Sequence, residues 1–348
     1  MSGKLVLKKF REVDLNDPFF DSLKSDYREF TSWFERKKDE EAYLFYDRGS
    51  IQGFLYFKKE TGPVTDVQPV IEGSRILKIG TFKINPHGTR LGERFLKKTL
   101  DYALIMQMEK CYVTIFERHK ALIDLFEKYG FYRHGIKVTE NGTELVLVKS
   151  LTALTGDIIK DYPLISIRGN NKYVLSIYPK YHSIMFPDSI LKNESVDILE
   201  DVSYTNSIHK IYVTRMKVHP LKRGDILVIY RTRDEGKSAE YSSVVSSICV
   251  VEDVRYQSDF ENFEDFYSYA TKYSVFDRTE LKEWFDAGGS YTIKMTYNAA
   301  LSKRLIRRKL IEEIGIERDM YWGFFQITDD QFIRILKEGG VLESIVID

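Results

Sequence analysis

Hydrophobic and polar positions along the first 150 residues predict an alternation of strands and helices. Short apolar runs indicate strands, at 42–46, 51–59, 75–84, 111–116, 131–137 and 144–148. Helical spacing of apolar residues predicts a helix from about Leu91 to Met108 and a shorter one around Ala121 to Tyr129. Segment 17–40 has the spacing of one or two amphipathic helices. Together these elements predict a mixed α/β domain.

A change of pattern near residue 150 indicates a domain boundary. Residues 149–163 contain two Thr, a Gly and a Pro between the last predicted strand and a new apolar run. This composition is typical of a linker. We therefore expect one domain over 1–150 and another over 163–348, joined by a linker over 151–162.

The second domain has a different pattern of elements. Strand-like runs separated by turns occur at 172–179, 208–216, 224–232, 241–254 and 290–297. Helices are predicted at Arg304–Glu313 and Asp329–Lys337. Several short strands with few helices favour a small β-barrel or a curled sheet. The whole chain is thus expected to be of the α/β (α+β) class, with a helix-flanked mixed sheet followed by a β-barrel with helices.

Composition and charge narrow the picture only slightly. The chain has 348 residues and is 43% hydrophobic, which is enough to supply a core for each of two domains. The net charge is zero, but residues 1–150 carry 26 basic and 22 acidic side chains, and the remainder carries 26 and 30. Any nucleic-acid contact must therefore use a local basic patch, because no overall positive field exists.

Two further features concern the environment of the protein. Cys111 and Cys249 lie in apolar runs far apart in the sequence, which favours reduced core thiols over a disulfide or a metal site. No apolar run has the length of a secretory signal or a membrane span. We expect a cytoplasmic protein that uses no metal and has no membrane partner.

A turn that precedes a helix is the first candidate for chemistry. The strand that ends at Ile84 is followed by Pro86, a turn with Gly88 and Gly92, and a helix with a buried stripe. Free N–H groups and the positive end of the helix dipole bind phosphate oxygens at such a turn. A plain strand-to-helix connection is the alternative, because this signal alone is weak.

The surroundings of this turn resemble the GNAT family of N-acetyltransferases. The family's pyrophosphate loop, Gln/Arg-x-x-Gly-x-Gly/Ala after the fourth strand, aligns with six residues: His87, Gly88, Thr89, Arg90, Leu91 and Gly92. Downstream, "IFERHKALIDLFEKYGFYRHG" is similar to the second cofactor motif, which ends in Gly-Phe. The resemblance covers about residues 40–148. It implies a GNAT-like fold and acetyl-CoA, or another acyl-CoA, held by this loop and by Phe82 and Ile84 of the preceding strand.

Departures from the family pattern affect catalysis. Phe126 occupies the position where many members carry the Tyr that protonates the CoA thiolate, so catalysis by that residue is excluded. His87 and Arg90 replace the usual Gln or Arg and the first Gly. Acid and base must then come from elsewhere. Our candidates for catalysis are Tyr129, Glu117 and His119; packing, helix capping or solvent exposure is the alternative explanation for each.

The second half of the chain resembles the ASCH family of the PUA-like superfamily. "KYVLSIYPKYHSIMFPDSILKNE" is similar to its opening strand and short helix, and "HPLKRGDILVIYRT" to its Gly-Asp-strand element. The match is good over about 170–255. It implies a PUA-like barrel that binds RNA or a modified nucleotide. Lys192 and Glu194 match the ASCH site by residue type, but its Gly and Arg do not align, so the amidohydrolase activity of some members is not carried over.

Basic and aromatic residues of this domain are candidates for nucleic-acid contact. Besides Lys192, they fall in two stretches, with Tyr204, Asn206, His209, Lys210 and Arg215 in the first and Lys303, Arg304, Arg307 and Arg308 in the second. The spacing of its leucines predicts that the second stretch is a helix with a buried face, for which a solvated basic surface is the alternative.

The two resemblances together imply an enzyme. We expect an acyl-CoA-dependent N-acyltransferase whose PUA-like domain presents a nucleic-acid or nucleic-acid-linked amine. One alternative is a non-catalytic protein that binds RNA or a modified base and retains a degenerate acetyltransferase scaffold. Another is an acetyltransferase for a small molecule or a protein amine. Fold analogy alone cannot choose among them.

Overall fold

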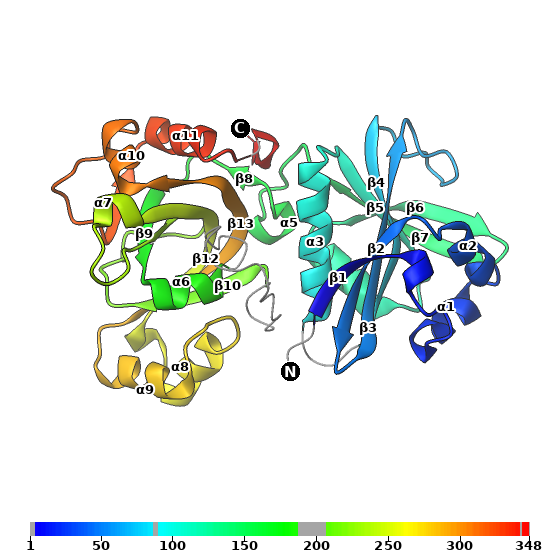
Figure 1. The fold of residues 1–348 in the computed structure, drawn as a ribbon, viewed down its shortest axis with the longest axis horizontal. Helices are drawn as coiled ribbons and strands as arrows, with labels where there is room; N and C mark the ends of the chain where they lie inside the picture. The colour runs from blue at the N-terminus through cyan, green and yellow to red at the C-terminus, as the bar shows by residue number, and fades with distance from the viewer. Residues whose placement is uncertain (1–3, 86–89, 187–206, 342, 348) are drawn as a thin grey trace. The chain divides into compact units, whose positions relative to one another are not determined.

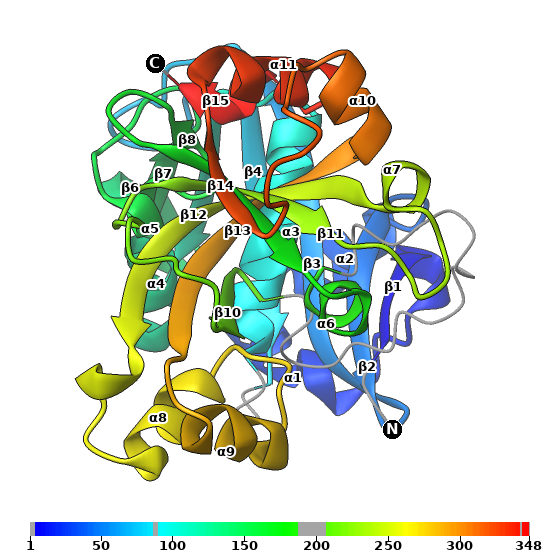
Figure 2. The same cartoon turned by 90° about the vertical axis from the view of Figure 1, so that its left-hand side faces the viewer.

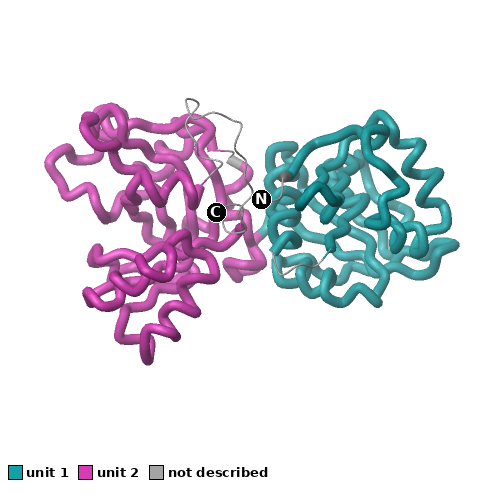
Figure 3. Tube along the Cα trace, turned by 60° about the horizontal axis from the view of Figure 1, so that its bottom comes forward, with its two compact units in different colours: residues 1–153, 196–203 teal, residues 154–195, 204–348 magenta. Residues whose placement is uncertain are grey.

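The computed structural model describes residues 4–85, 90–186, 207–341 and 343–347. The chain divides into two compact units with a boundary between Ala153 and Leu154 (Figure 3). The predictions for His87, Gly88, Thr89, Lys192, Tyr204 and Asn206 lie outside the described residues. Among the described residues, no helix combines the length and the apolar character that a membrane span needs.

Unit 1 is built on a seven-stranded sheet in the order β1-β2-β3-β4-β5-β7-β6 (Figure 1). The strands β4 and β5 are parallel, and every other neighbouring pair is antiparallel. The bounds are β1 Lys4–Lys9, β2 Glu41–Asp47, β3 Ser50–Thr61, β4 Arg75–Ile84, β5 Lys110–Ile115, β6 Tyr132–Thr139 and β7 Gly142–Ser150. The predicted strands are all present, whereas the sequence pattern missed β1.

Helices cover both faces of this sheet. The helix α3 (Leu91–Ile105) packs on β3, β4 and β5. A Cβ at Gly53 would lie 2.5 Å from Phe95 of α3, so the Gly53 side of β3 faces this helix. The next residue, Phe54, belongs instead to an aromatic cluster with α1 (Asp21–Asp26) and α2 (Phe30–Arg36). The two predicted amphipathic helices therefore cover the face opposite α3, as Figure 1 shows. The fourth helix, α4 (Lys120–Lys128), follows β5.

Unit 2 is built on a six-stranded sheet in the order β10-β13-β12-β11-β9-β14 (Figure 2). Its only parallel pair among the described residues is β9 with β11. The bounds are β9 Lys172–Ile177, β10 His209–Thr214, β11 Ile226–Arg231, β12 Val244–Tyr256, β13 Tyr291–Ile306 and β14 Phe324–Ile327. Two short strands, β8 (Ile165–Ser166) and β15 (Val346–Ile347), pair separately. Together with unit 1, this confirms the expected α/β fold class.

The helices of unit 2 are short and more numerous than the sequence predicts. They are α5 Ile158–Asp161, α6 Pro179–Met185, α7 Ala239–Ser242, α8 Phe263–Ala270, α9 Arg278–Asp286, α10 Arg307–Glu312 and α11 Asp329–Glu338. The sequence pattern missed α8 and α9, although Asn262 and Asp277 cap their first turns. The expected helix from Arg304 begins at Arg307, because β13 continues to Ile306 and pairs there with Val244.

Both cysteines are free thiols buried in the cores of their units, as the sequence predicted. Burial raises the pKa of the Cys111 thiol to about 12, and it also raises the pKa of Cys249. Both thiols are therefore protonated at neutral pH and unreactive.

A buried histidine makes the stability of unit 2 depend on pH. His182 of α6 is 2% exposed, and its Nε2 lies 2.6 Å from Oγ of Ser246. Burial, followed by the charges of Arg231 and Arg304, lowers the pKa of His182 to about 3. The ring is neutral in the folded protein, whereas the unfolded chain takes up a proton below about pH 6.5.

We predict that the free energy of unfolding falls as the pH drops from about 6.5 toward 4, by up to about 1.4 kcal/mol per pH unit from this group. His182→Gln should make this slope shallower in urea unfolding followed by circular dichroism. His219→Gln, at an exposed histidine of the same unit, is the control. An unchanged slope in His182→Gln would contradict the assignment.

Candidate functional site: a cavity between two diverging strands

The strands β4 and β5 pair over only part of their length. Their register runs from Ile76 with Lys110 to Ile79 with Val113 and then stops. Gly80 has no partner in the register with β3, where Tyr56 pairs with Thr81 and Phe57 with Ile79, so Gly80 is a β-bulge. Beyond Val113, β5 continues to pair with β7. The edge of β4 that faces β5 is therefore unpaired after the bulge.

A cavity of about 1040 Å³ lies where the two strands separate. Its walls include β4 from Lys78 to Ile84, the end of β5 from Val113 to Ile115, and Phe116 directly after it. The connection between α1 and α2 and the hairpin of β6 and β7 line it on one side, and the first turns of α4 line it on the other. The volume is at the upper end of the range found for small-molecule sites.

The expected cofactor residues of β4 lie in the cavity wall. Phe82 and Ile84 both line the cavity. The Phe82 ring packs against Phe95 of α3 at 5.7 Å and against Phe126 of α4 at 5.2 Å. Phe126 is fully buried in this aromatic group, which gives the residue at the family's Tyr position a packing role in this chain.

The start of α3 has the geometry of a tight turn. Arg90 precedes the helix with a φ of 54°, in the left-handed region, and Leu91 is buried. A Cβ at Gly92 would lie 2.9 Å from Cδ2 of Leu125 and 3.3 Å from Cδ1 of Ile84. A side chain at position 92 would therefore have to displace the end of Leu125, whether or not a phosphate approaches the turn.

A carboxylate and a phenol face each other on the other side of the cavity. Glu144 of β7 is 4% exposed, and its Oε1 accepts hydrogen bonds from the Tyr27 hydroxyl at 2.7 Å and from Thr114 Oγ1 at 3.1 Å. Burial raises the pKa of Tyr27, and the nearby charge of Glu144 raises it further. Tyr27 is thus a protonated donor at neutral pH. The sequence pattern missed both residues; the only signal was a Glu at the start of an apolar strand.

Surface contacts tie the connection between α1 and α2 to both neighbouring segments. Asp26 pairs with Arg118 at 2.5 Å and with Nε2 of His119 at 3.0 Å, in the turn between β5 and α4. Glu29 accepts hydrogen bonds from the amide of Asn141, at the tip of the hairpin of β6 and β7. These contacts partly close the cavity on the side of Tyr27 and Glu144.

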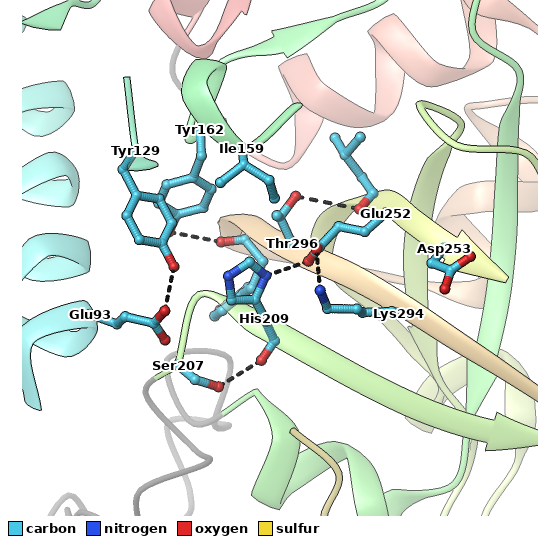
Figure 4. A network of polar contacts seen from close by, with 12 residues as sticks. Glu93, Tyr129, Ile159, Tyr162, Ser207, His209, Glu252, Asp253, Lys294 and Thr296 are labelled. Atoms are coloured by element: carbon cyan, nitrogen blue, oxygen red, sulfur yellow. Dashed lines mark hydrogen bonds and ion pairs between the residues drawn. The ribbon is translucent and has the colours of Figure 1, made fainter. Parts of the chain in front are cut away.

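The three catalytic candidates from the sequence lie in different environments. His119 lines the cavity at the start of α4. Glu117 is exposed and lies 3.6 Å from Arg133, outside the cavity lining. Tyr129 is fully buried, and its hydroxyl donates to Oε1 of Glu93 at 2.8 Å (Figure 4). The structure brings only His119 to the cavity, and the catalytic role of each residue stays a prediction.

Two of the nucleic-acid candidates are buried in unit 2. His209 and Lys210 of β10 are 2% and 0% exposed. Figure 4 shows Glu252 between His209, which contacts it through Nδ1, and Lys294, whose Nζ lies 2.8 Å away. Burial opposes ionisation of Glu252, but the hydrogen bond from His209 and the charge of Lys294 outweigh it and lower its pKa. Because these side chains are buried and contact one another, the network indicates a structural role in the sheet.

The remaining basic candidates have mixed exposure. Arg215, Lys303 and Arg308 are exposed, whereas Arg304 is partly buried. Arg307 lies over the Trp322 ring at 4.3 Å, and Arg308 pairs with Glu312 at 2.8 Å. Lys303 and Arg304 belong to β13, so the basic residues come from a strand end and a short helix. Nucleic-acid contact by these residues stays a prediction.

Comparisons with known proteins give matches at the level of structure. No family model matches the chain, and no curated protein matches it. An ASCH structure from Zymomonas mobilis is 10% identical, with a TM-score of 0.33, over 48% of this chain and 94% of that chain. An acetyltransferase of the GNAT family from Streptococcus pneumoniae is 13% identical, with a TM-score of 0.30, over 42% of this chain and 99% of that chain.

A further match is a chain of the NatC complex bound to Gag peptide and CoA. It is 17% identical, with a TM-score of 0.29, over 43% of this chain and 99% of that chain. The first two of these structures bear the names of the two families that the sequence resembles. Their identities and TM-scores are too low to bear on activity or on site residues.

The packing role of Gly92 can be separated from any role in ligand binding. Gly92→Ala should lower the free energy of unfolding by about 1 kcal/mol, because overpacking of the new Cβ against Leu125 outweighs the higher helix propensity of alanine. Leu125→Ala in the same chain should restore part of this loss in a double-mutant cycle measured by urea unfolding. Leu122→Ala, also on α4 and in the cavity lining, is the matched second change. Unchanged stability of Gly92→Ala would contradict the packing role.

Proposed function

We propose that the protein is an acyl-CoA-dependent N-acyltransferase, with acetyl-CoA as the expected donor. The observation that carries the proposal is the unpaired edge of β4 along a cavity that Ile84 and Asn85 line at the end of this strand, before α3 begins at Leu91. An extended arm with amide groups can pair with such an edge as a strand does. Free N–H groups at the first turn of a helix suit the phosphates at the other end of the donor.

The fit of an acyl-CoA is supported by the chemistry of the wall. Phe82, Ile84 and Leu125 supply apolar surface beside the edge of β4. Arg90, at the turn before α3, is the residue that we expect to pair with a phosphate. When bound, the donor supplies a thioester whose carbonyl carbon an amine can attack.

The residues of the chain then have to position the amine and move its proton. Glu144 faces the cavity with Oε1 engaged by Tyr27 and Thr114, and a carboxylate has further lone pairs for an ammonium group. We assign it the role of binding the acceptor amine and accepting its proton. Tyr27 holds the carboxylate in place through its O–H group. His119, at the rim of the cavity, is the second candidate base.

The acceptor is proposed to be a nucleic-acid or nucleic-acid-linked amine that unit 2 presents. The ASCH resemblance of the sequence suggests this class, and exposed Arg215, Lys303 and Arg308 supply positive charge for phosphate contacts. The alternative is a non-catalytic protein that binds RNA or a modified base. The burial of Phe126 among Phe82 and Phe131 favours it, because the usual acid of the family is replaced by a packed ring.

Acyl transfer can be tested with labelled acetyl-CoA and separate pools of aminoacyl-tRNA, total RNA and protein. We expect one pool to take up label. Glu144→Gln should reduce the rate by about 100-fold or more, the usual contribution of a positioned base, with donor binding retained. Glu140→Gln, at an exposed position in the same hairpin, is the control. Glu117→Gln and His119→Ala test the candidates from the sequence. Absence of label in every pool, with no acetyl-CoA bound, would refute the enzyme.

Nucleic-acid binding can be tested on the full chain with total RNA at low salt. Affinity should fall steeply as the salt concentration rises, because phosphate contacts release counterions. Alanine at Arg215, Lys303 and Arg308 should each weaken binding and reduce the slope of log K against log salt by about 1 per lost contact. Lys282→Ala, at an exposed lysine of α9 paired with Asp286, is the control. Equal effects of all four changes would contradict the proposed surface.

A further inference from the structure

Lys78, in the cavity wall, has no acidic partner in the part of the chain that the structure describes. Lys78 lies on β4 two residues before the bulge, is partly buried and lines the cavity. Among the described residues, no ion pair or hydrogen bond reaches its Nζ, which lies 5.5 Å from the centre of the Tyr112 ring. Burial, followed by the charge of Lys137, lowers the pKa of Lys78. A counter-charge would stabilise this ammonium group.

The charged neighbours of Lys78 already form pairs with one another. Lys58 lies 2.9 Å from Glu60, and Lys137 forms an ion pair with Asp66. The two lysines and two carboxylates cancel, so Lys78 adds one uncompensated positive charge to this part of the cavity. The arrangement favours a ligand with an anionic group at this point.

Lys78 and Glu144 lie on the same side of the sheet. Lys78 is in register with Tyr112, and its Nζ lies over the Tyr112 ring. Thr114 is two residues further along β5, so its side chain points to the same face as Tyr112, and it donates to Glu144. The cavity thus presents a cation and a carboxylate on the same face of the sheet.

We propose that the acceptor is an amine that also carries a carboxylate or a phosphate, with its ammonium group at Glu144 and its anionic group at Lys78. This inference rests on the proposed acyl transfer and names the class of acceptor. Glu144 alone would take any amine. Lys78 adds selection, because leaving it without a counter-charge in a partly buried site costs binding free energy. Trp33 and Tyr56 line the same cavity and limit the space around the acceptor.

The test compares acceptors that differ only in the anionic group. Glycine is paired with glycinamide, and phosphoethanolamine with ethanolamine, so the two pairs separate a carboxylate source from a phosphate source. CoA release from acetyl-CoA is measured with a thiol reagent. Wild type should prefer the anionic member of at least one pair by about tenfold or more in kcat/KM, the size expected for one charged hydrogen bond.

Lys78→Met should remove that preference by raising KM for the anionic acceptor, with kcat and the neutral acceptor little changed. Lys120→Met is the matched control, because that lysine lines the same cavity but is exposed at the start of α4 and takes no part in the charge balance around Lys78. It should keep the preference. Urea unfolding of both variants shows whether they are folded. Equal use of neutral and anionic acceptors by wild type would overturn the inference while leaving acyl transfer intact.

Failure of the proposed function has a different signature. In that case no amine releases CoA, and the inference is decided by binding of the same four amines in the presence of CoA, measured by calorimetry. Tighter binding of an anionic member that Lys78→Met abolishes would support the acceptor site in a protein without transfer activity. Equal binding within both pairs would overturn it.

Discussion

The site depends on one constraint in the sheet of unit 1, which is that β5 cannot follow β4 beyond Val113. The bulge at Gly80 turns the last residues of β4, while the pairing with β7 continues to hold β5 from Lys110 to Ile115. Two parallel strands held in this way must separate. The unpaired backbone N–H and C=O groups of β4 then need a partner from outside the sheet. The neighbouring helices and the hairpin of β6 and β7 form the walls of the cavity that results.

The two sides of this cavity differ in chemistry because the bulge changes the direction of successive side chains. Before Gly80, Lys78 lies on the same face of the sheet as Tyr112, toward the part of the cavity that contains Glu144. After Gly80, Phe82 packs on Phe95 and Phe126. A strand without a bulge would keep the two side chains on one face. The single extra residue therefore gives β4 an apolar face beside the proposed site of the acyl-CoA and a charged face beside the proposed site of the acceptor amine.

Local elements were predictable from the sequence because they depend on neighbouring residues. The spacing of apolar residues located β4 and the start of α3 correctly, and the loop between them drew attention to this edge of the sheet. Tyr27 and Glu144 were not predictable in the same way, since they lie 117 residues apart and meet only through the sheet order. The positions of Lys303 and Arg304 were misassigned for a related reason. Their sequence suits a helix, but β13 resumes its pairing with β12 at Leu305 and Ile306, beyond these two residues.

The connection between α1 and α2 has a consequence for exchange of whatever the cavity holds. Asp26, Tyr27 and Glu29 contact three segments, namely the turn after β5, the strand β7 and the hairpin tip. Each exposed contact is weak alone, but all three belong to four consecutive residues, so displacing the connection breaks them together. Opening on this side would therefore be cooperative, and the residence time of a ligand in the cavity would depend on the free energy of this short segment as well as on the ligand's own contacts.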